Sequence, residues 1–377
     1  MRDSLPKLHV MPTVERAEPV FVRGQGSWLW DAAGNAYLDF YQGAAANSLG
    51  HSPKSVVDAL QRQAEVLLNP GPTFYNRNLI KLAARLCQAT GSDQAYFLNS
   101  GAEANAAAVQ LARKWGQTHK GGARRIVRAT GSSHGLAMPA QTDCIDVPYN
   151  DFVALQQAVD DSCVALLLEP VQAEQGVTPA SLEYLQGAAR LCREQNLLLI
   201  LDEVQTGLGR CGALLAEERY GVRADILTLG KGLGAGVPLA ALLARGNACA
   251  FAPGDIHGTL HGNPLMTAAG LCVLQTVLEP GFLEHVREIA EHLKEGLERF
   301  ATANALSAPQ GHGLLLGLEL AHANQVSAYA MDEGLLIHAP TPQHLCFSPA
   351  LTVSHTNVDE MLRRLTRAFR RVAKGYV

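Results

Sequence analysis

A single lysine stands between two glycines directly after an apolar run, an arrangement that suits an amine used in covalent chemistry. Ile226–Leu229 form the run, and Lys231 follows between Gly230 and Gly232. Small neighbours leave room for a bulky group at the amine. Because an amine at the end of a buried strand is poorly solvated, its pKa falls and it becomes a better nucleophile. A Schiff-base lysine has these properties, although a solvated lysine at a strand end explains this segment equally well on its own.

A second apolar run ends in a carboxylate. Leu197–Leu201 are long enough for a buried strand, and Asp202 follows them. A carboxylate in that position is costly unless a cation pairs with it. The protonated ring nitrogen of pyridoxal 5'-phosphate (PLP) is such a cation, and an aspartate beside it lets the ring accept electrons. Nucleotide and metal sites also use this arrangement, but the chain has neither a glycine-rich phosphate loop with its own lysine nor a cluster of metal ligands.

A third segment could hold a phosphate. Gln94–Asn105 runs from a short apolar strand through Ser100, Gly101 and Ala102 into an alanine-rich helix. Small residues at a helix start leave backbone N–H groups open to an anion, and the helix dipole adds attraction. An ordinary strand-to-helix turn explains this segment equally well by itself. A phosphate cup, an aspartate and a lysine at three strand ends together indicate a PLP site.

With these residues in place, the chain resembles the class III (subgroup II) PLP-dependent aminotransferases, and within them the N-acetylornithine and succinylornithine aminotransferases. The matching segments occur in family order over nearly the whole length: Leu38–Phe40, Asn99–Asn105, Leu168–Gln172, Asp202–Arg210, Leu229–Gly232 and Gly262–Pro264. The resemblance implies an α/β protein with fold type I of the PLP-dependent transferases. It also implies transfer of an amino group from an amine or ω-amino acid to a keto acid or aldehyde through a Schiff base at Lys231.

The same resemblance assigns cofactor contacts to residues near the three strand ends. Backbone N–H groups of Gly101 and Ala102 bind the phosphate, and Ser100, Ser133 and His134 are also expected to contact the cofactor. Val204 packs on one face of the ring, and Gln205 lies near its phenolic oxygen.

A further contact is implied from another chain. Thr259 matches a family threonine that reaches the phosphate of the neighbouring subunit, which implies a homodimer with shared active sites. The alternative for Thr259 is a helix cap ahead of Pro264.

The substrate side departs from the family pattern. Where the family has an aromatic residue followed by His-Gly-Arg, this chain has Ser133 and His134, and Leu136 replaces the arginine. Both the stacking ring and one carboxylate clamp are therefore missing. Cys346 replaces a second arginine, although Glu174 matches the glutamate that pairs with that arginine in the family.

Neither leucine nor cysteine reproduces the bidentate contact between arginine and a carboxylate. Arg77 is the nearest candidate for a relocated clamp, although an arginine there is more often solvated. The segment from His134 to Glu169 is also shorter than in the family. We therefore expect an aminotransferase with an unusual donor or acceptor. The alternatives are a PLP enzyme of the same fold that catalyses racemisation, elimination or decarboxylation, and a non-catalytic relative.

Composition sets the class of protein. The chain has 377 residues, 47% of them hydrophobic, and a net charge of −4. This describes a soluble globular protein without a basic face for nucleic acid. Its eight cysteines lack Cys-x-x-Cys spacing, so we expect neither a metal site nor a disulfide framework. We find no apolar run long enough to span a membrane and no signal sequence, and we expect a cytoplasmic enzyme.

Strands and helices alternate along the middle of the sequence, which predicts a mostly parallel sheet with helices on both faces and ligands at the carboxyl ends of the strands. The expected strands are 95–98, 125–129, 164–168, 197–201, 226–229 and 239–244, with helices over 55–67 and 181–195. A long helical stretch is expected from Asn263 through residues 282–301, then strands over 313–320, 335–337 and 345–347 and a helix over 357–374. We expect a large PLP-binding domain over 46–260 and a smaller α+β domain from 1–45 and 261–377.

Overall fold

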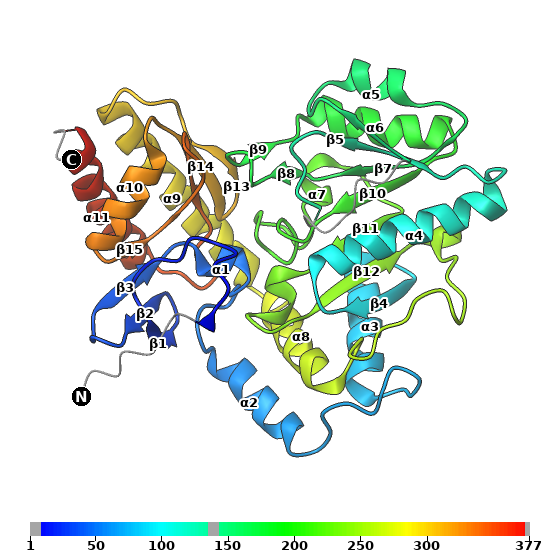
Figure 1. Ribbon diagram of the computed structural model, residues 1–377, viewed down its shortest axis with the longest axis horizontal. Helices are drawn as coiled ribbons and strands as arrows, with labels where there is room; N and C mark the ends of the chain where they lie inside the picture. Colours follow the sequence, from blue (N-terminus) through cyan, green and yellow to red (C-terminus); the bar gives the residue numbers. More distant parts are fainter. Residues whose placement is uncertain (1–8, 135–142, 374–377) are drawn as a thin grey trace.

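The computed structural model describes residues 9–134 and 143–373 and contains a seven-stranded central sheet (Figure 1). Its strands, in spatial order, are β4 (Gln94–Leu98), β12 (Ala240–Ala244), β11 (Ile226–Leu229), β10 (Leu198–Asp202), β7 (Cys163–Leu168), β5 (Arg125–Ala129) and β6 (Cys144–Val147). β12 is antiparallel to both of its neighbours, and the other adjacent pairs are parallel. The expectation of a mostly parallel sheet is therefore confirmed, and its six predicted strands begin and end within one residue of the observed ones.

Helices cover both faces of this sheet, because successive residues of each strand point to opposite sides. Ile200 packs in the cluster formed by α4 (Gly101–His119), whereas Leu199 and Leu201 pack in the cluster that contains α6 (Leu182–Glu194). Strands buried on both faces carry continuous apolar runs, which explains the composition of β7, β10 and β11. Shorter elements connect them: α5 (Phe152–Ala158), α7 (Glu217–Tyr220), β8 (Val171–Gln172), β9 (Thr178–Pro179), η2 (Lys231–Gly234) and η3 (Gly246–Ala248).

The two ends of the chain meet beside the large sheet (Figure 1). β1 (Phe21–Gln25), β2 (Trp28–Asp31) and β3 (Ala36–Asp39) form a sheet that β15 (Leu335–Leu336) joins. A second sheet has the order β13 (Gln310–His312), β14 (Leu315–Glu319), β17 (His344–Phe347) and β16 (His338–Thr341). α10 (Ala323–Asp332) and α11 (His355–Ala373) pack with these sheets, and α9 (Phe282–Ala303) packs against α11.

The remaining helices are α1 (Gln42–Ala45), α2 (Lys54–Ala64), α3 (Arg77–Thr90) and α8 (Pro264–Val277), of which α2, α3 and α8 lie below the sheets in the view of Figure 1. α8 packs against α2, α3 and η2, so a helix that follows residue 260 contacts the part of the chain that carries Lys231. The domain boundaries at residues 45 and 260 stay predictions.

The expected long helix after Asn263 is wrong, because it is two helices. α8 ends at Val277 and α9 begins at Phe282, and the two meet at 74°. Pro280 cannot continue a helix, and Gly281 has a φ of +87°, which suits glycine. The short strands β6, β13 and β16 were not expected from the sequence, because they are only partly buried and lack a clear apolar run.

No single helix among the described residues is long and apolar enough to cross a membrane, whereas the bent pair α8 and α9 together meet that test by length and composition.

A buried ion pair joins β12 to α7. Arg245 follows β12, and its guanidinium donates to the two carboxylate oxygens of Glu217 at 2.6 and 3.1 Å. The same guanidinium donates to the carbonyls of Ala224 and Thr90, both at 2.7 Å. Both charged side chains are less than 10% exposed. This pair therefore holds α7, which follows β10 along the chain, against the end of β12.

Replacing one partner of this pair should be costly. We expect Arg245→Leu to lower the free energy of unfolding by about 3–5 kcal/mol, because Glu217 would stay buried and unpaired. The double variant Arg245→Leu/Glu217→Leu should lose less, because no charge is left alone. Urea unfolding followed by circular dichroism measures both. Equal losses in the single and double variants would contradict this account.

Candidate active site

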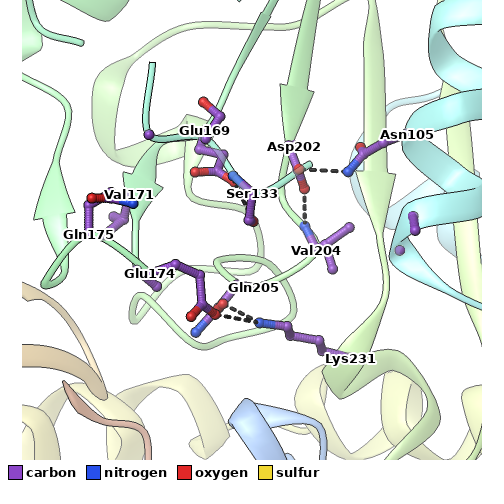
Figure 2. A pocket seen from close by; sticks show the side chains of 15 residues that line it. Asn105, Ser133, Glu169, Val171, Glu174, Gln175, Asp202, Val204, Gln205 and Lys231 are labelled. Carbon is purple, nitrogen blue, oxygen red and sulfur yellow. Dashed lines mark hydrogen bonds and ion pairs between the residues drawn. The ribbon is translucent and has the colours of Figure 1, made fainter. Parts of the chain in front are cut away.

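The three strand ends singled out in the sequence open into one cavity of about 510 Å³ (Figure 2). β4, β10 and β11 run in the same direction, so their carboxyl ends lie on one edge of the sheet. The cavity is lined by residues that the sequence had indicated: Gly101, Ala102, Ser133, Glu174, Asp202, Val204, Gln205 and Lys231. Residues spread over more than a hundred positions are thus brought together by sheet topology.

Asp202 ends β10 and lies at the bottom of the cavity, 5% exposed. Its Oδ2 accepts hydrogen bonds from Asn105 Nδ2 at 2.7 Å and His134 Nδ1 at 2.9 Å, and its Oδ1 accepts one from Val204 N at 3.1 Å. Burial opposes the charged form, yet these donors and the charge of His134 together keep the pKa of Asp202 below its usual value. The buried carboxylate is therefore held ionised. The Thr228 hydroxyl in turn positions Asn105, because it donates to Asn105 Oδ1 at 2.7 Å.

His134 is the second buried ionisable group at this end of the cavity. Burial disfavours its charged form, but the hydrogen bond to Asp202 and the charges of Asp202 and Glu169 outweigh burial and raise its pKa. Its Nε2 is buried and has no hydrogen-bond partner among the described residues. Glu169 lies 4.0 Å from the imidazole and accepts from the Ser133 hydroxyl at 2.9 Å. Burial, the largest effect on it, raises the pKa of Glu169.

The start of α4 forms the end of the cavity where we expect the phosphate. Ser100 caps the helix: its Oγ accepts from Glu103 N at 3.2 Å, and Glu103 accepts in return from Ser100 N at 3.1 Å. The N–H groups of Gly101 and Ala102, in the first turn, have no partner within the helix. A Cβ at position 101 would lie 2.6 Å from Val204 Cγ1, so only glycine lets this turn approach the residue expected to cover the ring.

Lys231 reaches the cavity from a strained backbone. Its φ of +40° is a conformation that non-glycine residues seldom adopt and that is often found at functional sites. Its amine donates to Gln205 Oε1 and lies 3.9 Å from Glu174 Oε1 (Figure 2). Burial, opposed by the charges of Glu174 and Asp202, lowers the pKa of Lys231. A lowered pKa makes more of the unprotonated, nucleophilic amine available.

These features fit PLP. The free N–H groups at the start of α4 suit its phosphate, and the ionised Asp202 suits its protonated ring nitrogen. The Lys231 amine suits its aldehyde carbon. The atoms of His134, Glu169 and Asp202 that could bind a metal lie within 4.8 Å of one another, but the His134 and Asp202 atoms already bind each other at 2.9 Å. The donor set therefore matches the cofactor expected from the sequence.

The remaining predicted residues lie outside the lining of this cavity. Thr259 and Arg77 are exposed, in the loop before α8 and at the first turn of α3. Cys346 is buried in β17, beside the cavity. Leu136 lies outside the described residues.

Three residues that touch the site were not assigned from the sequence alone. Asn105 and Thr228 position Asp202, and Glu169 positions Ser133. Each is a buried polar side chain within an otherwise apolar segment, and buried polar groups need partners. A lone polar residue in an apolar segment can therefore be recognised in the sequence as a candidate, but the sequence does not show which residue it binds.

Comparison with known proteins agrees with this site. The family model "Aminotransferase class-III" matches residues 11–151 and 137–369. Acetylornithine aminotransferase 2 of Bordetella bronchiseptica is 42% identical over 97% of this chain and 98% of its own length. Acetylornithine aminotransferase of Ralstonia nicotianae is 42% identical over 96% of each chain. The structure of N-acetylornithine aminotransferase from Stenotrophomonas maltophilia superposes with a TM-score of 0.88 at 32% identity, over 96% of this chain and 98% of that one.

The family model spans most of the chain, and the relatives match it from end to end. Both findings agree with the cavity in which Lys231, Asp202 and the start of α4 meet. The chain belongs to the class III aminotransferase family and is a PLP-dependent aminotransferase of fold type I.

Proposed function

We propose that the enzyme transfers an amino group from an amine or ω-amino acid to a keto acid or aldehyde, with Lys231 and Asp202 as its catalytic residues. The observation that supports these roles is the single cavity in which the Lys231 amine, the Asp202 carboxylate and the start of α4 meet. PLP, when bound, supplies the carbonyl group that takes up the amino group and the ring that accepts electrons.

Each of these residues has a separate task in the proposal. Lys231 would hold the cofactor through its amine, and its Nζ, when free, would act as the acid–base group that moves a proton at the substrate carbon. Asp202, held ionised by Asn105 and His134, keeps a proton on the ring nitrogen. The N–H groups of Gly101 and Ala102 bind the phosphate. Gln205 and Val204, which line the same cavity, would contact the cofactor ring.

The site acts within a homodimer in this proposal. Thr259 is exposed in a single chain, and Asn69 Nδ2 donates to its carbonyl at 3.2 Å. The surface around this loop and before α3 carries large exposed apolar side chains: Val66 (79%), Leu68 (54%), Phe74 (66%), Tyr75 (87%) and Leu260 (53%). A second copy of the chain would cover this surface and bring Thr259 to the partner's phosphate. We also propose that the enzyme is cytoplasmic.

The residues of the substrate pocket support a substrate preference that differs from that of the relatives. Cys346 and Leu136 stand where the family has arginines, and Ser133 stands where it has a stacking ring. Arg77 stays the candidate for a relocated carboxylate clamp, although it is exposed at the first turn of α3 and does not line the described cavity. Glu174 keeps its place beside Lys231.

The role of Lys231 can be tested by its removal. We expect Lys231→Ala to abolish covalent attachment of PLP, because no other lysine lines the described part of the cavity. Borohydride reduction followed by mass spectrometry measures the attachment. Lys54→Ala, which removes an exposed amine, should leave it unchanged. A reducible adduct that persists in Lys231→Ala would overturn the assignment.

Asp202→Asn should keep much of the PLP binding but lower turnover about 100-fold or more. The substitution preserves shape while it removes the charge that holds the ring proton. Cofactor absorbance measures binding, and single-turnover amine conversion measures the rate. Turnover within a few-fold of the wild type would mean that Asp202 has only a structural role.

The missing arginines predict a changed substrate preference. Loss of each charge-assisted contact costs about 1.5–3 kcal/mol, so N-acetylornithine and 2-oxoglutarate should be poor substrates, by several hundred-fold or more in kcat/KM, unless another residue of the pocket replaces part of the lost contact. A panel of amines and keto acids ranks the alternatives, with less acidic amines expected to perform better. Fast exchange between N-acetylornithine and 2-oxoglutarate would refute this expectation.

A further inference from the structure

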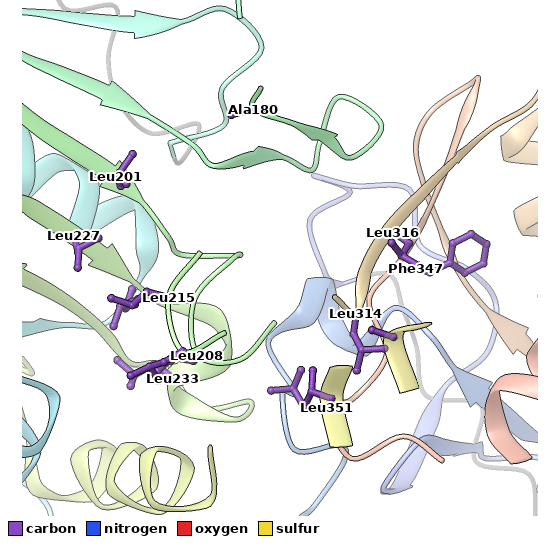
Figure 3. Close-up of a cluster of buried hydrophobic side chains, with 14 of the residues drawn as sticks. Ala180, Leu201, Leu208, Leu215, Leu227, Leu233, Leu314, Leu316, Phe347 and Leu351 are labelled. Carbon is purple, nitrogen blue, oxygen red and sulfur yellow. The ribbon is translucent and has the colours of Figure 1, made fainter. Parts of the chain in front are cut away.

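A histidine lies directly opposite the cysteine that replaces the family arginine. In the second sheet, Cys346 on β17 pairs with Gly317 on β14 and with His338 on β16. Residues opposite one another in neighbouring strands point to the same face of a sheet. Leu316 and Phe347 point to the other face, into the hydrophobic core (Figure 3). His338 and Cys346 therefore share the face that is turned away from this core.

The segment that carries Glu174 lies on that same face. A Cβ at position 317 would be 2.3 Å from Gly176 O and 2.8 Å from Val177 Cβ, so the glycine allows the turn between β8 and β9 to rest directly on the sheet. Cys346 packs in one apolar cluster with residues at both ends of this turn. The contact brings Glu174, within the turn, to the row formed by Gly317, Cys346 and His338.

Glu174 is placed between two groups that can be cationic. Its Oε2 lies 3.9 Å from His338 Nε2, and its Oε1 lies 3.9 Å from Lys231 Nζ. The pKa of Glu174 lies below its usual value, and the contact with His338 is the largest cause. Burial raises this pKa, and the charge of Lys231 lowers it further. Glu174, which pairs with an arginine in the family, pairs here with an imidazole.

The neighbouring groups cannot supply the missing charge. Cys346 is 4% exposed, and burial raises the pKa of its thiol to about 12, so the thiol stays neutral. The Arg210 guanidinium is buried and donates to the carbonyls of Leu314 and Pro349. The His338 side chain, in contrast, is 38% exposed, with its ring 5.0 Å from that of Tyr41. His338 is not among the residues that line the cavity, but it lies directly behind Glu174, which is, so a ligand that displaced Glu174 would meet the imidazole.

We propose that His338 binds the carboxylate of the keto-acid acceptor, in the role of the arginine that Cys346 replaces. This inference rests on the proposed function, since it assigns the acceptor end of the same pocket. Glu174 pairs with the imidazole when the pocket is empty, and the substrate carboxylate displaces Glu174 when it binds. An imidazole offers one N–H at this point where a guanidinium offers two, so recognition is weaker and less dependent on geometry.

The test measures carboxylate binding without turnover. Glutarate, a dicarboxylate with no keto group, is titrated calorimetrically into the PLP-loaded enzyme. We expect His338→Gln to weaken glutarate binding about tenfold or more, because glutamine keeps a donor but carries no charge. The double variant His338→Gln/Cys346→Arg should recover binding, since the arginine returns the charge to the same face. The control His292→Gln, which alters a histidine paired with Asp359 at 2.8 Å, should bind as the wild type does.

The outcomes separate this inference from the proposed function. Equal glutarate affinity in wild type and His338→Gln, no measurable binding to the wild type, or an equal loss in His292→Gln would each overturn the role of His338. Conversion of bound PLP to pyridoxamine phosphate by an amine without a carboxylate tests amino transfer alone. A wild type that binds glutarate through His338 but fails this conversion would reject the proposed function and keep the carboxylate site.

Discussion

The Asp202 carboxylate is buried at the end of β10, and the surrounding residues are arranged to keep it charged. An isolated carboxylate in this position would take up a proton, because burial penalises the ionised form. Donors from two other segments prevent this, Asn105 from α4 and His134 after β5, together with the backbone N–H of Val204 two residues further on. The position of each donor depends on the sheet order, so the fold and the charge of Asp202 are coupled.

That coupling also explains why the polar residues of the site have little freedom. Thr228 on β11 fixes Asn105, and Glu169 after β7 fixes Ser133. The first contact connects β11 to α4, and the second connects the end of β7 to the loop after β5. A network of this kind is favourable only when all its members are satisfied. The buried His134 Nε2, without a partner in the described part of the chain, is the one atom of the network that still needs one.

The side of the pocket that carries Glu174 is built differently. There, the position of Glu174 depends on contact between a turn of the large sheet and a face of the smaller one, through Gly317. This contact brings residues from separate parts of the chain to the pocket mouth. A change of residue in β17 could be compensated from β16, because paired strands present both side chains to the same place. The loss of an arginine therefore need not remove a carboxylate site, provided that a neighbouring strand supplies a cation.

The sequence by itself determined the cofactor, the family and most of the central sheet. Lys231, Asp202 and the start of α4 were recognisable because their chemistry depends on local context: a strand end, a glycine neighbour or a helix start. The buried strands were equally clear, since burial on both faces demands continuous apolar runs. Only the tertiary structure decided which side chains surround these residues. The break between α8 and α9, the partners of Asp202 and the pairing of His338 with Cys346 depend on contacts between distant segments. Local patterns carry no information about such contacts, because strand order and register are set by packing of the whole chain.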